Sequence, residues 1–198
     1  MRILSVSDKV VAELDSNLDR QRFGRIDLVL ACGDLPPEYL ASLANAFSVP
    51  LYYVCGNHDI RLVDRRPAGC INLNGKIASH RGLKILGLEG SRWYNGGLFQ
   101  YTESEMRWRV IALTPRIWRH RGVDIVITHA PPRHIHDAED RCHRGFKSFR
   151  RLIKRYAPRY FIHGHMHADF ADPSDRITEW QGTQIINTYG YHVLEIGP

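Results

Sequence analysis

The chain lacks the features that mark membrane and secreted proteins. No apolar run in its 198 residues approaches the roughly 18 residues that cross a bilayer. Its first residues have the pattern of a strand, with neither the length nor the cleavage site of a signal peptide. The four cysteines contain no C-x-x-C pair. We therefore expect a cytoplasmic protein with reduced thiols.

The sequence also lacks linkers, low-complexity segments and solenoid repeats. A length of 198 residues is enough for one full core and is short for two domains. The apolar share of 43% is ordinary for a globular protein. We therefore predict a single domain over residues 1–198.

The charge balance is positive, with a net charge of +6, and there are eleven histidines. This balance suits an anionic substrate. A basic run over 147–155 lies largely off the apolar stripe of a predicted helix, which usually indicates a solvated face. Phe149 within the run belongs to the apolar stripe, so no aromatic residue is interleaved with the basic side chains on the polar face. The chain also has no recognisable nucleic-acid module, so nucleic acid is not the favoured partner.

Strand and helix patterns alternate in the first half. Strands are predicted over 2–7, 27–31 and 51–54, with helices over 10–23 and from Pro37 onward. This β-α-β-α-β order indicates a partly parallel sheet.

The second half begins with shorter strands. Asn74-Gly75 separates strand-like runs at 71–73 and 76–79 and predicts a hairpin. Thr102 and Glu105 have the spacing of a capping box, which predicts a helix to about residue 118. Further strands are predicted at 83–88, 123–128, 160–163, 177–181, 183–187 and 191–196, and an amphipathic helix through Phe149, Leu152, Ile153 and Tyr156.

Polar side chains follow several of the predicted strands. The stretch Cys55-Gly56-Asn57-His58-Asp59 comes directly after the apolar run 51–54. Sheets of this type place their sites at the carboxyl ends of neighbouring strands. Matching chemistry stands at Asp8, at Gly33-Asp34, at Thr128-His129 and at Gly164-His165-Met166-His167.

These strand ends supply oxygen and nitrogen donors for metal ions. The donors are Asp8, Asp34, Asn57, His129, His165 and His167. A shared carboxylate could hold two cations close together. The mixed donors suit Mn, Fe, Zn, Co or Ni better than Mg or Ca. His165 and His167 are two residues apart, so on an extended segment both rings would point to the same side.

Two metals without an obvious nucleophilic serine or cysteine favour hydrolysis. The metals would lower the pKa of a bound water and neutralise a phosphoryl oxygen. His58 would protonate the leaving oxygen, and Asp59 would hold its ring. Asn57 would serve as both a ligand and a phosphate contact.

Taken together, these motifs resemble the calcineurin-like metallophosphoesterases over nearly the whole chain. The pattern of that family is D-x-H, G-D, G-N-H-[DE], a lone His and G-H-x-H. The resemblance implies an α/β fold, a four-layer αββα sandwich with two central mixed β-sheets flanked by helices. It implies Asp8, Asp34 and His167 on metal 1, and Asp34, Asn57, His129 and His165 on metal 2, with Asp34 as the bridge and His58 as the catalytic histidine.

One position departs from the family pattern, because Val10 stands where D-x-H has its histidine. Water could fill the place, or a group from Asp137, Asp140 or His143 could substitute. Alternatively, only metal 2 is bound and the protein has left catalysis. We expect a working but weaker metal 1.

The stretch Gly90-Ser91-Arg92-Trp93-Tyr94 resembles the Gly-Ser-Pro-Trp segment of a subgroup that acts on cyclic-nucleotide-like phosphodiesters, with Arg92 in place of the proline. Ser91, Arg92 and Trp93 are therefore candidate substrate-binding residues, with Trp93 in an aromatic wall for a base or aryl group. The alternative is a packed turn.

Some of these residues also have simpler explanations. Asp8 and Asp34 could be helix N-caps. The position of His163 at a strand end favours a buried structural role. His134, His136 and His143 lie in a long loop, where surface positions are favoured over pocket positions.

The sequence thus favours a metal-dependent phosphoesterase that acts on a small phosphoester. Phosphodiesters are favoured over phosphomonoesters, and a nucleotide is one candidate substrate. A non-catalytic binding scaffold on the same fold is the main alternative, and Val10 supports it. The phosphoesterase-like subunit of the retromer coat resembles that case. A nuclease is a further alternative.

Overall fold

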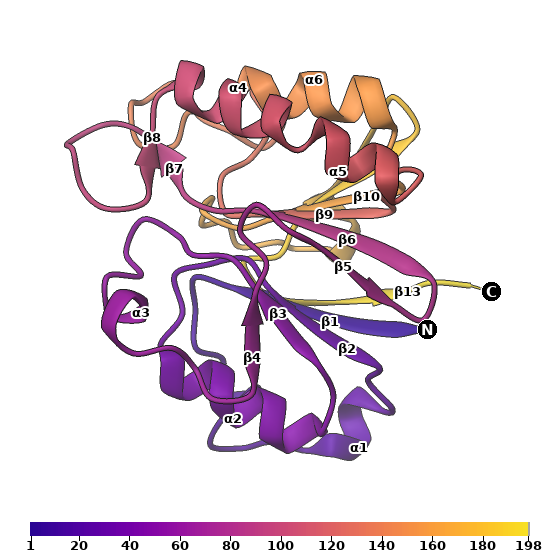
Figure 1. Ribbon diagram of the computed structural model, residues 1–198. Coiled ribbons are helices and arrows are strands. Elements are labelled where there is room, and N and C mark those ends of the chain that lie inside the picture. The colour runs from indigo at the N-terminus through magenta and orange to yellow at the C-terminus, as the bar shows by residue number, and fades with distance from the viewer. Residues whose placement is uncertain (198) are drawn as a thin grey trace.

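The computed structural model describes residues 1–197 and shows two β-sheets stacked between two layers of helices (Figure 1). Sheet A contains β1 (Arg2–Ser7), β2 (Leu28–Ala31), β3 (Leu51–Tyr53), β4 (Cys70–Asn72) and β13 (Gly190–Glu195). Sheet B contains β5 (Ile77–His80), β6 (Leu83–Leu88), β9 (Ile125–Thr128), β10 (Tyr160–His163), β11 (Ile177–Trp180) and β12 (Thr183–Asn187). A small ribbon pairs β7 (Ser91–Arg92) with β8 (Gln100–Tyr101).

Both large sheets are mixed, in the orders β13-β1-β2-β3-β4 and β11-β12-β10-β9-β6-β5. In sheet A, β1, β2, β3 and β4 are parallel, and β13 pairs antiparallel with β1. In sheet B, β6, β9, β10 and β12 are parallel, with antiparallel edges at β5 and β11. The carboxyl ends of the parallel strands therefore gather at one edge of each sheet.

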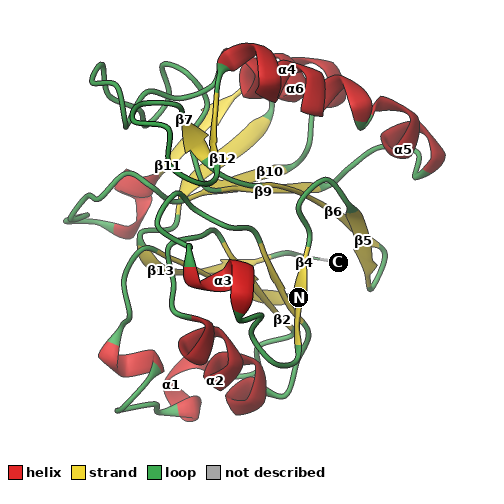
Figure 2. Cartoon of the chain, turned by 60° about the vertical axis from the view of Figure 1, so that its left-hand side comes forward, coloured by secondary structure: helices red, strands yellow, loops and turns green. Residues whose placement is uncertain are grey.

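Helices cover the outer face of each sheet, as the side view in Figure 2 shows. The helices beside sheet A are α1 (Arg20–Phe23), α2 (Pro37–Phe47) and α3 (Arg61–Asp64). Those over sheet B are α4 (Glu103–Ala112), α5 (Thr114–Arg119) and α6 (Lys147–Tyr156). Two 3₁₀ turns complete the elements, η1 (Ala12–Leu14) and η2 (Pro173–Arg176). The αββα sandwich implied by the resemblance is confirmed.

Three apolar layers hold these four layers together. Alternation along the strands sends side chains to opposite faces, so Ile3 joins the core between the sheets and Leu4 joins the core under α2. Phe149 and Leu152 of α6 pack in the third layer, against the outer face of sheet B. Every central strand is therefore buried on both faces, which explains the apolar runs in the sequence.

The predicted helix over 10–23 is wrong. The segment forms η1 and then the one-turn helix α1, which Asp19 caps by accepting a hydrogen bond from the Gln21 amide at 2.9 Å. Leu14 and Phe23 are both buried, and a turn separates them. Burial of a few apolar residues does not require a continuous helix.

The predicted hairpin at Asn74-Gly75 is also wrong. The strand before it, β4, pairs with β3 in sheet A, and the strand after it, β5, pairs with β6 in sheet B. The turn therefore carries the chain from one sheet to the other, with Leu73 buried at the crossing. The Asn-Gly pair predicts a turn correctly but does not decide which strands pair.

The capping box at Thr102 is confirmed. The Glu105 amide donates to Thr102 Oγ1 at 3.2 Å, and the Thr102 amide donates to Glu105 Oε2 at 2.7 Å. The helix it begins ends at Ala112 rather than continuing to residue 118. Pro115 explains the break, since it has no amide proton for the helical ladder.

Candidate metal centre

Loops that follow five strands meet at one edge of the sandwich. The Asp8 amide donates to the Gly33 carbonyl at 3.1 Å, which joins the ends of β1 and β2. The His165 amide donates to Asp8 Oδ2 at 2.9 Å, which joins β1 of sheet A to β10 of sheet B. The His58 amide donates to Asp34 Oδ1 at 2.8 Å. The structure thus brings the predicted site residues of both sheets together.

His129 lies at the centre of this group and is completely buried. Its Nδ1 is 2.8 Å from the Cys32 carbonyl oxygen. Its Nε2 is 3.1 Å from Asn57 Oδ1 and 3.3 Å from Asp34 Oδ2. A carbonyl on one ring nitrogen orients the ring and directs the other nitrogen toward a metal.

Asp34, His129 and His165 offer ligand atoms that all lie within 4.8 Å of one another. The His165 ring is 4.7 Å from the His129 ring, centroid to centroid. His165 Nε2 is 2.7 Å from the carbonyl oxygen of Cys142, so the long loop before α6 holds this ring. These three residues, with Asn57, are the set expected on metal 2.

The residues expected on metal 1 lie next to this set. His167 Nε2 approaches Asp8 Oδ1 to 3.5 Å, and the Asp8 side chain is 1% exposed. Asp8 Oδ1 accepts no hydrogen bond from the described residues. A buried carboxylate oxygen without a donor is costly, and a cation would relieve that cost. The donors therefore fit a second divalent ion, and Val10, 43% exposed, adds no ligand.

Burial and neighbouring charges shift the pKa values of three side chains in this site. Burial opposes a charged His129 ring, but the Asp34 carboxylate outweighs burial and raises the pKa of His129. Burial likewise opposes a charged Asp34, but the His129 ring lowers the pKa of Asp34 to about 2. Burial lowers the pKa of His165 to about 4 and keeps its ring in the neutral, metal-binding form.

Gly56 and Gly164 of the motifs are needed because neighbouring side chains leave no room for a Cβ atom at these positions. A Cβ on Gly56 would contact the Asp34 carboxylate and lie 2.7 Å from His129 Cε1. A Cβ on Gly164 would press against the Asp8 carboxylate in the same way. Asp8, Asp34 and His165 themselves have left-handed φ values of 64°, 56° and 67°, a strained conformation that is concentrated at functional sites.

Asp59 has a different role from the one expected of it. Its Oδ2 accepts hydrogen bonds from the amides of Gly56 at 2.7 Å and Asp34 at 2.8 Å, and its Oδ1 accepts one from the Leu35 amide at 3.1 Å. Among the described residues it makes no hydrogen bond with the His58 ring, which is exposed. Because buried amides require acceptors, the carboxylate turns inward and ties the loops after β2 and β3 together. Burial raises the pKa of Asp59 to about 6.

Tyr94 was not among the predicted site residues, but its hydroxyl accepts a hydrogen bond from Asn57 Nδ2 at 3.2 Å. Its place beside Trp93 in an aromatic loop was the available signal. Trp93 is 56% exposed, whereas Ser91 is buried. Arg92 pairs with Glu103 at 3.0 Å. Of the three predicted substrate residues, Trp93 is therefore the one free to contact a ligand.

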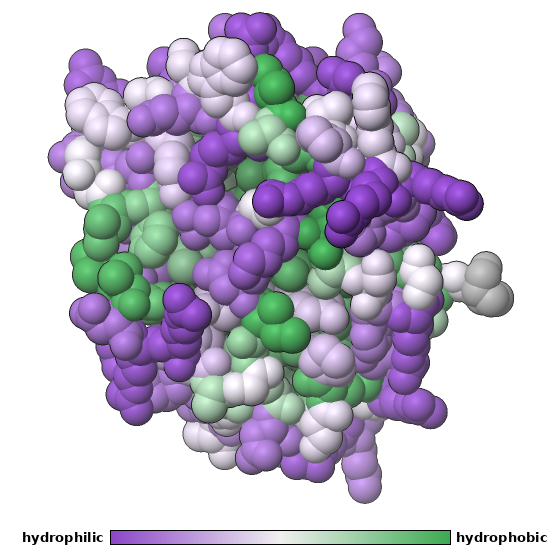
Figure 3. Space-filling model, in the orientation of Figure 1, coloured by the Kyte–Doolittle hydropathy of each residue, from purple (hydrophilic) through white to green (hydrophobic). Residues whose placement is uncertain are grey.

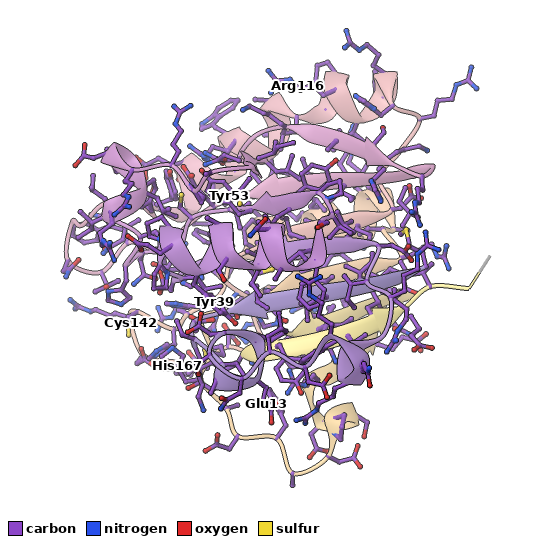
Figure 4. All side chains as sticks on the ribbon, turned by 90° about the horizontal axis from the view of Figure 1, so that it is seen from below. Glu13, Tyr39, Tyr53, Arg116, Cys142 and His167 are labelled. Carbon is purple, nitrogen blue, oxygen red and sulfur yellow. The ribbon has the colours of Figure 1, made fainter. Side chains whose placement is uncertain are left out.

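The remaining loop histidines are divided between structure and surface. His163 is completely buried, as expected, and its Nε2 is 3.0 Å from His136 Nδ1. His136 is thus part of a structural pair rather than a surface residue. His143 packs 5.2 Å from the His165 ring and contacts Asp140 and Cys142. Figure 4 shows Cys142 and His167 at the same edge of the molecule.

None of the helices within residues 1–197 combines the length and hydropathy that crossing a bilayer would require.

The fold resembles several solved structures. One crystal structure matches 98% of this chain and 94% of that chain at 15% identity, with a TM-score of 0.71. The calcineurin-like phosphoesterase YfkN from Bacillus subtilis matches over 98% and 89% at 12% identity, with a TM-score of 0.51. A single mutant of Vps29 from Entamoeba histolytica matches over 99% and 86% at 17% identity, with a TM-score of 0.50. Identities this low show the fold alone.

The sequence itself also has a family assignment. No curated protein matches the chain closely enough to count as a relative. The family described as calcineurin-like phosphoesterase matches residues 1–169, which is most of the chain and includes every motif that contributes to the site. The chain therefore belongs to the calcineurin-like phosphoesterase family.

Proposed function

We propose that this protein is a metal-dependent phosphoesterase that hydrolyses phosphodiesters. The observation that carries the proposal is the convergence of Asp34, Asn57, His129 and His165 around one point, with the undonated Asp8 Oδ1 beside His167. Carboxylate, amide and imidazole donors in this density suit divalent ions of intermediate softness.

Asp34 is suited to bridge two ions because its two oxygens face different neighbours. Its Oδ1 accepts the His58 amide, and its Oδ2 faces His129 Nε2. Asn57, His129 and His165 would complete metal 2, and Asp8 and His167 would complete a weaker metal 1. Bound ions would supply charge neutralisation at the phosphoryl group and a lowered pKa for water.

The side chains of this chain would bind and orient the substrate and transfer a proton to it. His58 is exposed, and its amide is fixed to Asp34, so its ring lies at the open side of the site and would protonate the leaving oxygen. Asn57 is held by Tyr94, which aligns its amide for a phosphate contact. Trp93, on the same loop, would stack against a base or aryl group of a diester.

A non-catalytic scaffold is the second candidate, and Val10 is the observation that favours it. Without the histidine of D-x-H, metal 1 would have three protein ligands. The exposed His58 argues against the scaffold, because a binding surface has no need of a proton donor beside a metal site.

The test is hydrolysis of bis(p-nitrophenyl) phosphate with added Mn²⁺. Asn57→Ala should abolish turnover, and Asn45→Ala, an exposed asparagine of α2, is the matched control that should retain it. Turnover of p-nitrophenyl phosphate without turnover of the diester would change the proposed activity from diesterase to monoesterase. No turnover of either compound with Mn, Ni, Co, Fe or Zn would favour the scaffold.

A further inference from the structure

The helices over sheet B carry the positive charge of the whole protein. Segments 102–121 and 146–156, called here the basic helix layer, contain ten Lys and Arg residues and two Glu residues, while the rest of the chain has 17 basic and 19 acidic residues. The ten cations are Arg107, Arg109, Arg116, Arg119, Arg121, Lys147, Arg150, Arg151, Lys154 and Arg155. The layer therefore has a net charge of +8, against −2 for the remainder.

The cations of this layer are not neutralised within the protein. Across residues 1–197, Arg109 is the one member of the ten within 4.0 Å of a carboxylate, at 3.4 Å from Glu89. The two acidic residues of the layer accept hydrogen bonds from backbone amides and do not pair with its cations. Glu103 accepts from the amides of Lys147 and Ser148 at the start of α6, and Glu105 belongs to the capping box. A merely solvated face usually mixes both signs of charge.

A groove of about 320 Å³ runs between α4 and α6 in this layer. Arg107 lines it from α4, and Arg151 and Arg155 line it from α6, over an apolar floor that includes Leu152. Lys147, Arg151 and Arg155 are spaced by four residues, so they form a row on successive turns, about 5–6 Å apart. A row of this spacing matches successive phosphates of an extended strand.

Two exposed tryptophans border the groove. Trp108 of α4 is 69% exposed and Trp118 of α5 is 68% exposed. Trp108 lies one turn from Ile111, and Trp118 one turn beyond Thr114, and both of those residues line the groove. Figure 3 shows apolar side chains among hydrophilic ones over these helices. The only aromatic residue of the basic run, Phe149, is buried, so the exposed aromatic rings beside the groove come from the neighbouring helices α4 and α5.

We propose that the basic helix layer binds single-stranded nucleic acid. The row Lys147, Arg151 and Arg155 and the facing Arg107 contact the phosphates. The bases stack on Trp108 and Trp118, which is how non-specific single-strand binders combine charge with aromatic platforms. An acidic polypeptide would use the cations equally well but would have no use for two exposed indole rings. The surface is separate from the metal centre, as Figure 4 shows for Arg116 and His167.

Fluorescence anisotropy with a labelled single-stranded oligonucleotide tests this surface. The groove variant carries Arg107→Gln, Arg151→Gln and Arg155→Gln. The matched variant carries Arg20→Gln, Arg22→Gln and Arg25→Gln, which remove the same charge at exposed positions in and beside α1, on the opposite side of the molecule. The groove variant should bind at least about tenfold more weakly, with the salt slope of log K reduced by about 2. The matched variant should keep the slope.

Trp108→Ala separates nucleic acid from other anions. It should weaken oligonucleotide binding about fivefold or more and leave the salt slope unchanged, because stacking carries no charge. Asn57→Ala should bind as the wild type does, which keeps this test independent of the proposed hydrolysis. Thermal melting of each variant checks that it is folded.

Three results would overturn the proposal. Equal losses in the two triple variants would mean general charge attraction. Binding of polyglutamate as tight as that of the oligonucleotide, with no effect of Trp108→Ala, would assign the surface to an acidic protein. Absence of any anisotropy change at low salt would mean that the surface binds no single strand.

Discussion

His129 and His163 are both completely buried, and they follow or end the neighbouring parallel strands β9 and β10. Each has one ring nitrogen near a backbone carbonyl oxygen, of Cys32 for His129 and of Gly164 for His163. Their second nitrogens differ. His129 faces the Asp34 carboxylate, whereas His163 faces the neutral ring of His136. Burial therefore does not distinguish the two histidines, but the charge of the neighbouring group does.

The largest effect should come from removing that charge. Asp34→Asn leaves His129 buried with a neutral partner, as His163 is now, and removes the carboxylate proposed to bridge the two ions. We expect Mn²⁺-dependent diester turnover to fall by at least about a hundredfold, the upper end of what outer-shell partners contribute. His163→Gln is the control and should keep turnover within a few-fold. An equal loss in the two variants would mean that the two histidines do not differ in role.

The second effect tests the close packing of Gly56 against the Asp34 carboxylate and the His129 ring. Gly56→Ala places a methyl group against Asp34 and His129. We expect a loss of about 1–3 kcal/mol in the free energy of unfolding, the usual range for overpacking. The stabilisation by Mn²⁺ should also be lost, and urea unfolding with and without the ion measures both. Gly197→Ala, where an added Cβ meets nothing, should change neither value.

The third effect is a pH dependence of folding stability that comes from the neutral pair of His163 and His136. Burial, aided by His136, lowers the pKa of His163 well below its ordinary value. Above pH 6.5 both the folded and the unfolded chain hold this ring neutral. As the pH falls below 6.5, the unfolded chain binds a proton that the folded chain excludes, so stability is lost.

His163→Gln should therefore remove about 1 kcal/mol of the stability change between pH 7 and pH 5.5. Chemical unfolding of the metal-free protein at the two pH values measures it. His134→Gln, at an exposed position, is the matched control and should leave the stability change as in the wild type. A stability change between the two pH values that is the same in His163→Gln as in the wild type would contradict the assignment of His163.

The smallest effect concerns Trp93, the exposed aromatic residue near the candidate metal centre. Trp93→Ala should raise KM for a nucleotide diester about fivefold to tenfold, at the lower end of what one stacking contact contributes. KM for bis(p-nitrophenyl) phosphate should change less. Steady-state kinetics on the two substrates gives the comparison, and equal changes would make Trp93 part of a packed turn.

Much of this site could be predicted because its motifs follow strands. The bounds of β1, β10 and β12 agree with the sequence pattern, since apolar runs between turn residues leave few alternatives. Parallel strands then place Asp8, Asp34 and His129 at one edge. Local rules of spacing and topology were sufficient for this part.

The rest depended on contacts between distant segments. Nothing near Asp59 in sequence indicates that its carboxylate binds the amides of Asp34 and Leu35, which come from another strand end. Tyr94 reaches Asn57 across 37 positions. The tryptophans beside the basic groove belong to helices that a sequence pattern cannot place against α6. Pairing partners, as at Asn74-Gly75, are decided by the whole fold.

The hydrogen bond between His165 and the Cys142 carbonyl means that a residue outside the motifs helps to orient a motif histidine. Any residue at position 142 would present a carbonyl group, so this contact depends on the path of the loop and not on the identity of a side chain. Loops tolerate insertions and deletions far better than strands do. Over evolutionary time, changes in the length of this one loop could retune metal affinity while every motif residue stays in place.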